Sequence, residues 1–291
     1  MITWPNFVSQ LFNGLATGAL LALISSGLTI IYGTLGVLNL AHGAMFMLGG
    51  YAGYVAFQAT GSFVVAVIAG ALFLVVVGAA LERVVIRRFY DRPPEDQILL
   101  TFGIGIVMVE LVRFGFGSLS VSVPPPAWAA GVTPMGFLIY PTYRIVVLGI
   151  AAVALGTLYI VLYRTRLGLM VRAGIEDSGM VGMLGINVYR VFMIVFGIGA
   201  MAAGFAGIVN APVVSLTPDI GDSILVQTFV VVVIGGVWSF PGAILGGLIS
   251  GEILSLTSMV DPAYSQVMLF VVMTLVLLLR PQGLLGQRGR A

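Results

Sequence analysis

Residues 62–92 read SFVVAVIAGALFLVVVGAALERVVIRRFYDR. The first part, 62–81, contains no charged residue and is long enough to cross the hydrocarbon core of a bilayer, which takes about 20 apolar residues as a helix. The basic residues that follow are Arg83, Arg87, Arg88 and Arg92. Arginine next to the end of an apolar span is typical of the cytoplasmic side of a membrane. The stretch therefore predicts a transmembrane helix that ends in the cytoplasm.

The composition of the whole chain also indicates a membrane protein. Of its 291 residues, 59% are hydrophobic and 8% are charged. A soluble domain carries about 25% charged residues, so a chain this poor in charge cannot cover a water-exposed surface. We expect one transmembrane domain over 1–291, with several spans and no separate soluble domain.

The absence of certain residue types excludes several classes of function. The chain has no cysteine and a single histidine, His42, so we expect no metal site. All 13 basic residues are arginine, which excludes a Walker A phosphate loop and Schiff-base chemistry, because both need lysine. No G-x-S-x-G nucleophile motif occurs either. We therefore expect no catalytic residues, no cofactor bound by this chain and no nucleic-acid partner.

Apolar runs recur along the chain at lengths that suit membrane-spanning helices. The candidate spans are 11–31, 35–57, 62–81, 98–116, 144–163, 191–209, 225–240, 241–258 and 264–280. Glycine and proline interrupt 35–57 and 225–258, so we expect half-helices or re-entrant segments in one or both stretches. The pattern predicts an all-α polytopic transmembrane bundle of about eight to ten spans, with interrupted helices.

The arginines also predict how the chain is oriented. Three polar stretches, 83–92, 164–190 and the tail from Arg280, hold 11 of the 13 arginines and are cytoplasmic by the positive-inside rule. The segment 117–143 lies between two of them, carries no charge and is rich in proline and aromatic residues. We expect this segment to be external, with the N-terminus outside and the C-terminus in the cytoplasm.

Two polar side chains interrupt the apolar stretch LGVLNLAHGAMFMLGG at 35–50. Asn39 and His42 are three residues apart and would share one face of a helix. Polar groups in a membrane either form hydrogen bonds to a neighbouring helix or line a translocation pathway, and the sequence leaves both open. A break in the helix before Gly43 would loosen the backbone there. We take Asn39, His42 and Gly43 as pathway candidates, and expect His42→Leu to impair transport more than assembly.

Apart from the first and last residues of the predicted spans, three charged residues lie inside them. Glu110 and Arg113 are three residues apart near the external end of one span, and we expect a structural ion pair between them. Glu252 lies in an apolar run with no charged neighbour in the sequence. Ionisable residues within membranes are expensive and usually functional, so Glu252 is a fourth pathway candidate. A buried partner on another span, or protonation, is the alternative.

The longest cytoplasmic stretch, 164–190, has 27 residues, more than a simple connection needs. Its pattern of charged and apolar residues predicts a short amphipathic helix over 172–185. A helix of this kind suits a protein partner or the membrane surface, whereas the plain alternative is an ordinary connector. The candidate docking residues are Arg172, Glu176, Asp177, Met180, Leu184 and Gly185.

Four stretches of the chain carry the pattern of a known family. They are LTIIYGTLGVLNLAHGAMFMLGGYAG (28–53), LTFGIGIVMVELVRFGFG (100–117), RAGIEDSGMVGMLGINVYR (172–190) and VVVVIGGVWSFPGAILGGLISGEIL (230–254). Together, and in this order, they resemble the permease subunits of branched-chain amino acid type ABC importers. The resemblance extends over about 11–286.

The resemblance implies a set of partners and a location. The chain would be half of a heterodimeric channel in the cytoplasmic (inner) membrane of a bacterium or archaeon, surrounded by lipid. A related second permease would supply the other half. Two cytoplasmic ABC ATPases would bind ATP and Mg²⁺ and drive the cycle, and a periplasmic or surface-anchored binding protein would deliver the substrate.

The resemblance also gives the segment 172–185 a role, because it is similar to the coupling segment that docks into a groove on the ATPase. Reversing the charges of Glu176 and Asp177 is then expected to uncouple ATP hydrolysis from uptake. The segment departs from the family pattern at Gly174, Gly179 and Gly182, where relatives often have alanine or a charged residue. Each glycine weakens a helix by about 1 kcal/mol, so we expect the coupling helix to be short or ordered only against its partner.

Two other functions are weighed against this one. A self-contained channel or secondary transporter for a small neutral solute, such as urea or an amide, suits the interrupted segments but lacks ionisable groups for coupling. An intramembrane enzyme is opposed by the single histidine and the absence of cysteine and lysine. Within the importer family, the sequence does not distinguish branched-chain amino acids from other neutral amino acids, urea, amides or aromatic acids.

Overall fold

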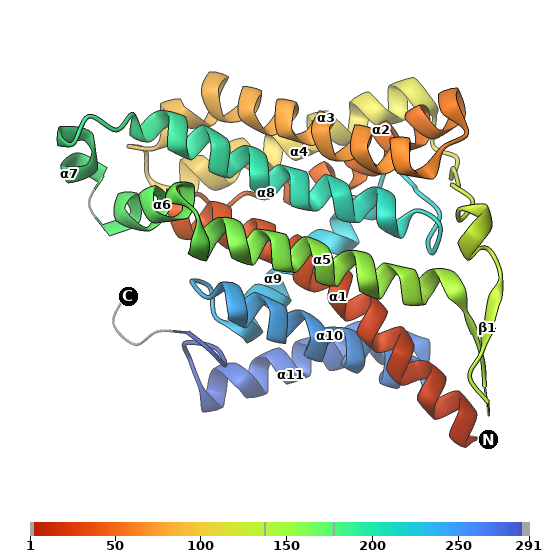
Figure 1. Ribbon diagram of the computed structural model, residues 1–291. Helices are drawn as coiled ribbons and strands as arrows, with labels where there is room; N and C mark the ends of the chain where they lie inside the picture. The colour runs from red at the N-terminus through yellow and green to blue at the C-terminus, as the bar shows by residue number, and fades with distance from the viewer. Residues whose placement is uncertain (1–2, 137, 177, 287–291) are drawn as a thin grey trace.

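The chain folds into a helical bundle in this computed structural model, which describes residues 3–136, 138–176 and 178–286 (Figure 1). Its α-helices are α1 (Trp4–Leu35), α2 (His42–Thr60), α3 (Phe63–Val84), α4 (Pro94–Phe116), α5 (Thr142–Arg164), α6 (Arg166–Glu176), α7 (Ser178–Met183), α8 (Val188–Asn210), α9 (Ile220–Gly235), α10 (Phe240–Val260) and α11 (Ser265–Leu279). The short elements are the 3-10 helices η1 (Ile86–Phe89), η2 (Ala127–Ala129) and η3 (Pro262–Tyr264), and the antiparallel strands β1 (Val132–Pro134) and β2 (Ile139–Pro141). The predicted all-α bundle is confirmed.

Each of the nine predicted spans contains a helix. Seven helical segments of the described chain are long and apolar enough to cross a membrane. The other two are α2 and α9. The 16 residues of α9 rise about 24 Å, less than the roughly 30 Å of a hydrocarbon core, and α2 begins only after the non-helical residues 36–41. Both helices belong to the stretches that the sequence marks as interrupted.

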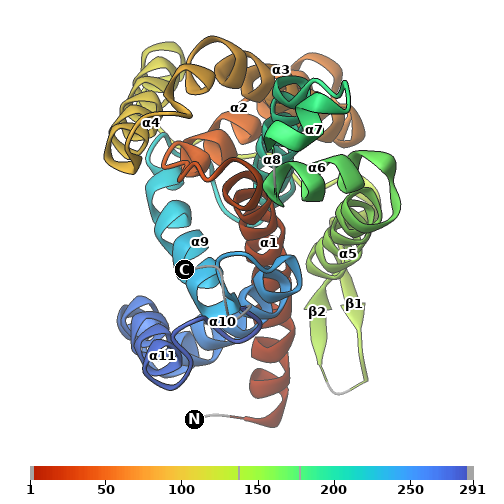
Figure 2. The ribbon, with the colours of Figure 1, turned by 90° about the vertical axis from the view of Figure 1, so that its left-hand side faces the viewer.

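The helix α1 forms the centre of the bundle, and other helices pack around it (Figure 2). It packs most extensively along α10, where small residues let the two backbones approach. A Cβ atom added at Gly18 would lie 2.8 Å from Leu248 Cα, and one added at Gly247 would lie 2.5 Å from Ala22 Cα. Membrane helices associate through such close packing, because lipid provides no hydrophobic driving force between them.

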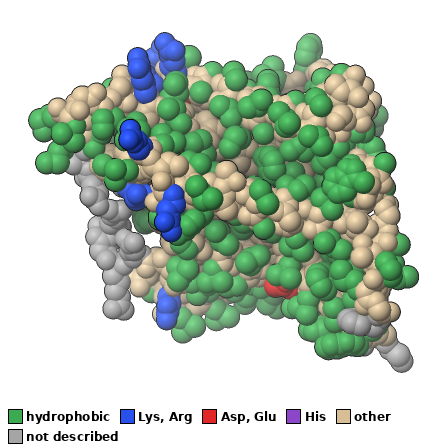
Figure 3. Space-filling view, in the orientation of Figure 1, with side chains coloured by type: hydrophobic (Ala, Val, Ile, Leu, Met, Phe, Trp, Pro, Cys, Tyr) green, Lys and Arg blue, Asp and Glu red, His purple; other side chains and the backbone are tan. Residues whose placement is uncertain are grey.

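The two ends of the bundle differ in charge. Arginine side chains gather at the end that carries α6 and α7, and apolar side chains cover most of the flank between the ends (Figure 3). The hairpin of β1 and β2 lies at the opposite end, together with the start of α1 (Figure 1). The predicted topology requires this arrangement, with arginine-rich loops at one end and the uncharged segment at the other. We refer to these as the cytoplasmic and external ends.

Candidate functional site

The segment between α1 and α2 lies inside the bundle, and side chains satisfy its backbone. Gly36 ends α1 with a left-handed φ of 69°. Asn39 then closes a turn: its Oδ1 accepts a hydrogen bond from Ala41 N at 3.1 Å, and its carbonyl accepts one from His42 N at 3.2 Å. Asparagine forms such turns readily and favours helix starts. Asn39 therefore sets where α2 begins.

Thr101 of α4 forms hydrogen bonds to the backbone of the same segment. Leu40 N donates a hydrogen bond to Thr101 Oγ1 at 3.1 Å, and this oxygen lies 3.0 Å from Leu38 O. Non-helical backbone at membrane depth is tolerated only where protein or water satisfies its polar groups. No local pattern in the sequence marks Thr101, because its partners are 61 and 63 residues away.

His42 is fully buried and contacts a neighbouring helix. Its Nε2 lies 3.0 Å from the carbonyl oxygen of Ile24 on α1, and Nδ1 has no hydrogen-bond partner among the described residues. This geometry corresponds to the interhelical hydrogen bond that the sequence left open as one alternative. The side chain of Asn39 is also fully buried, so a pathway role for either residue stays a prediction.

Gly43 lets the start of α2 approach the start of α9. A Cβ atom added at Gly43 would collide with the carbonyl oxygen of Gly221 and lie 2.8 Å from Leu225 Cβ. A Cβ atom added at Gly221 would lie 2.7 Å from the carbonyl oxygen of Gly43. The two glycines therefore form a direct backbone contact, which joins the interrupted helix to α9.

Arg113 joins α4 to the residue that precedes α9. Its guanidinium forms an ion pair with Glu110 on the same helix and a second with Asp219, in which Nη2 lies 2.6 Å from Oδ1. The side chains of Arg113, Glu110 and Asp219 are 36%, 57% and 66% exposed. The ion pair expected from the sequence is thus part of a three-residue network. Asp219 was missed as a partner because it lies 106 residues away.

A small pocket lies beside this network, where the start of α2, the middle of α4 and the start of α9 meet. Its volume is about 230 Å³. The interrupted segment and the first turn of α2 contribute Leu40 and Ala44 to its apolar wall. Its charged wall consists of Glu110, Arg113, Asp219 and Asp222. The interrupted segment therefore forms part of the surface of a pocket with two chemically distinct sides.

Glu252 lies apart from these groups. It extends from α10 toward Gly14 of α1, and its Oε2 is buried without a hydrogen-bond partner among the described residues. Gly14 precedes Ile24, the partner of His42, by ten residues, which is about 15 Å along a helix. The predicted pathway candidates therefore fall in two places, with Asn39, His42 and Gly43 together and Glu252 elsewhere.

The cytoplasmic segment predicted as an amphipathic helix over 172–185 is helical on both sides of Asp177, a residue outside those that the structure describes. The helix α6 starts earlier than predicted, at Arg166, and α7 runs from Ser178 to Met183, two residues before Gly185. Gly179 and Gly182 each weaken a helix here by about 1 kcal/mol, and Gly185 has a φ of 80°, which ends a helix. Asp177 and the side chain of Glu176 lie outside the described residues.

Apolar side chains project from the end of this segment. Met183 and Leu184 are 83% and 75% exposed, and Met180 is exposed as well. Arg172, in contrast, lies over the ring of Tyr163 at 5.6 Å and donates a hydrogen bond to a carbonyl of α5. Arg172 therefore holds α6 against α5, whereas α7 presents an apolar surface at the cytoplasmic end.

A buried carboxylate at the cytoplasmic end also escaped the sequence analysis. Glu82 accepts hydrogen bonds from Arg87 Nε at 3.2 Å, Arg87 Nη2 at 2.9 Å and the Tyr90 hydroxyl at 2.8 Å. Arg87 also lies over the ring of Tyr189, at the start of α8, at 5.1 Å. Hydrogen bonding to Glu82 raises the pKa of Arg87, and burial raises the pKa of Tyr90. The network joins the loop after α3 to α8, because Arg87 Nη2 also donates a hydrogen bond to Tyr189 O at 3.3 Å.

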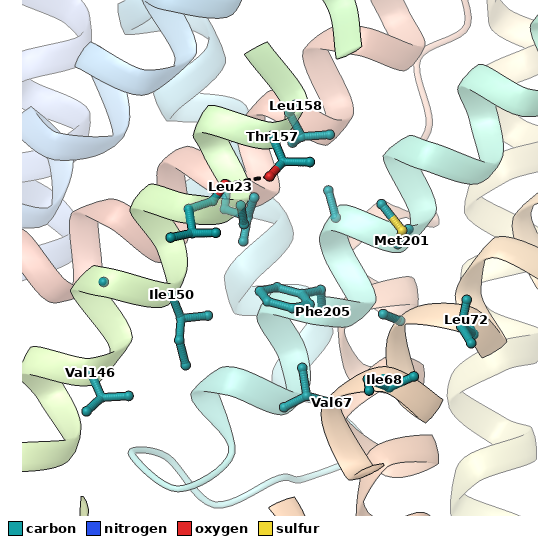
Figure 4. Close-up of a pocket in the computed structure, with 15 residues that line it drawn as sticks. Leu23, Val67, Ile68, Leu72, Val146, Ile150, Thr157, Leu158, Met201 and Phe205 are labelled. Atoms are coloured by element: carbon teal, nitrogen blue, oxygen red, sulfur yellow. Dashed lines mark hydrogen bonds between the residues drawn. The ribbon is translucent and has the colours of Figure 1, made fainter. Parts of the chain in front are cut away.

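An apolar groove of about 750 Å³ runs between α3, α5 and α8 (Figure 4). Val67, Ile150 and Phe205 line it from these three helices. Thr157, the hydroxyl-bearing residue of the described lining, donates a hydrogen bond to Val153 O on its own helix at 2.8 Å. This wall suits contact with lipid chains rather than with a polar substrate.

Comparison with known proteins gives matches over nearly the whole chain. The family model described as branched-chain amino acid transport system / permease component matches residues 10–277. The high-affinity branched-chain amino acid transport system permease protein LivH of Escherichia coli (strain K12) is 33% identical, over 97% of this chain and 96% of that protein. The corresponding protein BraD of Pseudomonas aeruginosa is 29% identical, over 97% and 96%. The probable branched-chain amino acid transport permease protein LivH of Methanocaldococcus jannaschii is 25% identical, over 92% and 89%. No solved structure gives a significant match.

Proposed function

The chain belongs to the family of branched-chain amino acid transport system permease components, and from this premise we propose that it forms half of the translocation pathway of an ATP-driven ABC importer. The family resemblance seen in the sequence is confirmed. The chain is a multi-pass inner-membrane transport subunit rather than an enzyme. We propose branched-chain or similar small neutral amino acids as its cargo, because its relatives are named for that transport.

The energy for transport is proposed to come from other chains. The sequence has no lysine and hence no Walker A loop. Two cytoplasmic ABC ATPases would bind ATP and Mg²⁺, a second related permease would complete the pathway, and an external binding protein would deliver the amino acid. The proposed location is the cytoplasmic membrane of a bacterium or archaeon, as the family resemblance implies.

The observation that carries the proposal is the apolar surface of α7 at the arginine-rich end. Met183, the last residue of α7, and Leu184, which follows it, are exposed, and an apolar surface of this kind suits a protein partner or the membrane surface. Docking of such a helix into an apolar groove is a recurring mode of recognition. An ATPase groove is the occupant that a permease without its own nucleotide site requires.

Co-purification tests the proposal. The tagged chain is co-expressed with candidate partner subunits from the same organism, and the purified material is tested for ATPase activity. We expect an ABC ATPase and a second permease to be retained, and leucine with its binding protein to stimulate ATP hydrolysis. A chain that retains no ATPase and transports urea or an amide without nucleotide would instead be a self-contained channel or secondary transporter.

A further inference from the structure

The pocket between α2, α4 and α9 combines apolar and charged walls in a way that suits a small zwitterion. Its volume of about 230 Å³ is below the range of about 300–1,000 Å³ typical of pockets for drug-sized ligands. A single amino acid is a ligand of the appropriate scale. The pocket therefore differs from the apolar groove between α3, α5 and α8, which offers no charged group.

The exposure of the charged wall indicates whether the face formed by α4 and α9 contacts lipid or an aqueous environment. Glu110 lies six residues before the end of α4, which is about 9 Å along the helix. Its side chain and that of Arg113 are exposed even though they are paired. Charged groups in membrane segments almost always face a bundle interior or a water-filled cavity rather than lipid. The face formed by α4 and α9 thus belongs at the aqueous pathway or against the second permease.

The charges of the pocket are not balanced within it. Its wall has three carboxylates, on Glu110, Asp219 and Asp222, and one guanidinium, on Arg113, so the formal sum is −3 + 1 = −2. Arg113 is shared between Glu110 and Asp219. The carboxylate of Asp222, in the first turn of α9, forms no ion pair with a described residue. It is available to an ammonium group from outside the chain.

We propose that this pocket is an amino-acid subsite of the translocation pathway. In this subsite, Asp222 accepts hydrogen bonds from the α-ammonium group of the amino acid. The α-carboxylate replaces either Glu110 or Asp219 as an ion-pair partner of Arg113. The aliphatic side chain of the substrate packs against the apolar wall, to which the interrupted segment contributes Leu40. The inference rests on the proposed function, because it assumes that small neutral amino acids pass this chain.

Geometry supports the proposed orientation of the substrate. The apolar wall is formed by Leu40 and Ala44 together with residues of α4 and α9, and the hydrogen bond from Leu40 N to Thr101 holds that segment in place. A guanidinium binds a carboxylate through two parallel hydrogen bonds. The alternative is that Arg113 has only a structural role and connects α4 to the start of α9. If Arg113 binds the substrate, leucine should protect residues of the pocket from chemical modification; if its role is only structural, leucine should not.

Cysteine accessibility distinguishes these alternatives, because the chain contains no cysteine. Ile106→Cys and, separately, Val109→Cys place a thiol in the pocket, and Val153→Cys places one in the apolar groove as a control. Each variant is purified in complex with its partner subunits, and a membrane-impermeant cationic thiol reagent is added with and without leucine. The cysteine-free chain in the same complex gives the background.

We expect the two pocket thiols to react and the groove thiol to stay unmodified. Leucine should slow the reaction of the pocket thiols, whereas leucinamide, which lacks the carboxylate, and 4-methylpentanoate, which lacks the ammonium group, should not. The apparent affinity for leucine is measured from the leucine concentration that protects the pocket thiols. Asp222→Asn should lower this affinity roughly tenfold or more, because a charge-assisted hydrogen bond is lost. Asp91→Asn, in the cytoplasmic loop, is the matched control and should leave protection unchanged.

Two results would overturn the inference. If the wild-type complex transports leucine but neither pocket thiol is protected, the subsite is wrong and the proposed function stands. Equal protection in Asp222→Asn and in wild type would remove the assigned role of Asp222. If the complex transports no amino acid at all, the proposed function fails and the subsite fails with it.

Discussion

Thr101 shows how one hydroxyl stabilises the most irregular part of the membrane domain. It binds the backbone of Leu38 and Leu40, neither of which can form helical hydrogen bonds there. Thr101→Val should destabilise the protein by about 1–3 kcal/mol, because the N–H of the half-buried Leu40 is left without an acceptor. Thr101→Ser keeps the oxygen and should cost less. Thermal unfolding of both variants in detergent measures the difference, and equal melting temperatures would contradict the assigned role.

Glu82 is a second residue whose replacement is expected to lower the stability of the protein substantially. Glu82→Ala removes the acceptor of three hydrogen bonds, and it should destabilise the cytoplasmic end by about 2–4 kcal/mol. Arg83→Ala is the control, because Arg83 is exposed and is the adjacent residue. Limited proteolysis of the loop after α3 reads out the local effect. Equal cleavage rates in the two variants would show that the network is dispensable.

Some of these structurally important residues can be recognised from the sequence and others cannot. The difference is how far along the chain their hydrogen-bonding partners lie. Asn39 and His42 are conspicuous because they are polar in an apolar run, and the partner of Asn39 is only two residues away. Thr101 and Asp219 have partners more than sixty residues away. Glu82 follows a predicted span, where an acidic residue is unremarkable. Only the folded chain shows that it is buried.

At the scale of the elements, the approach of α2 to α9 depends on glycine. Gly43→Ala places a methyl group against the carbonyl oxygen of Gly221 and should destabilise the protein by about 1–3 kcal/mol through overpacking. Gly156→Ala on α5 is the matched control, since a Cβ atom there meets no atom within 4 Å. It should be neutral or slightly stabilising. Thermal unfolding compares them, and a Gly43→Ala variant as stable as Gly156→Ala would exclude a tight contact.

The apolar surface at the end of α7, where Leu184 directly follows the helix, gives a prediction about assembly. Leu184→Glu should leave the chain folded, because Leu184 is exposed, but it should reduce the amount of ATPase retained on purification about tenfold through the loss of apolar contact. Leu119→Glu changes an equally exposed leucine at the external end and should retain the ATPase in full. If both variants retain equal amounts, α7 is not the docking element.

The helices themselves and the two interrupted stretches were largely predictable, whereas the bounds of the cytoplasmic helix were not. All nine predicted spans contain a helix, because twenty apolar residues in lipid have few other ways to satisfy their backbone. Composition also located the two interrupted stretches through their glycine and proline residues. The early start of α6, at Arg166, was missed, because the apolar pattern used to predict the cytoplasmic helix begins only at Arg172.

For the whole molecule, the distribution of charge agrees with the proposal that the ATPases dock at one end and the amino acid enters at the other. Arginine side chains mark the cytoplasmic end beside α6 and α7 (Figure 3), and the pocket with its excess of carboxylates opens on the face of α4 and α9 toward the external end. Energy is thus expected to enter at one end and the amino acid at the other. The chain between them holds neither a phosphate loop nor a lysine.

The most direct test of this account is uptake of labelled leucine into vesicles that contain the chain with its second permease and ATPases, with ATP inside and the binding protein outside. We expect uptake that requires every subunit and that stops when ATP is replaced by an analogue that cannot be hydrolysed. Uptake of leucine at the same rate by vesicles containing this chain alone, without nucleotide, would contradict it.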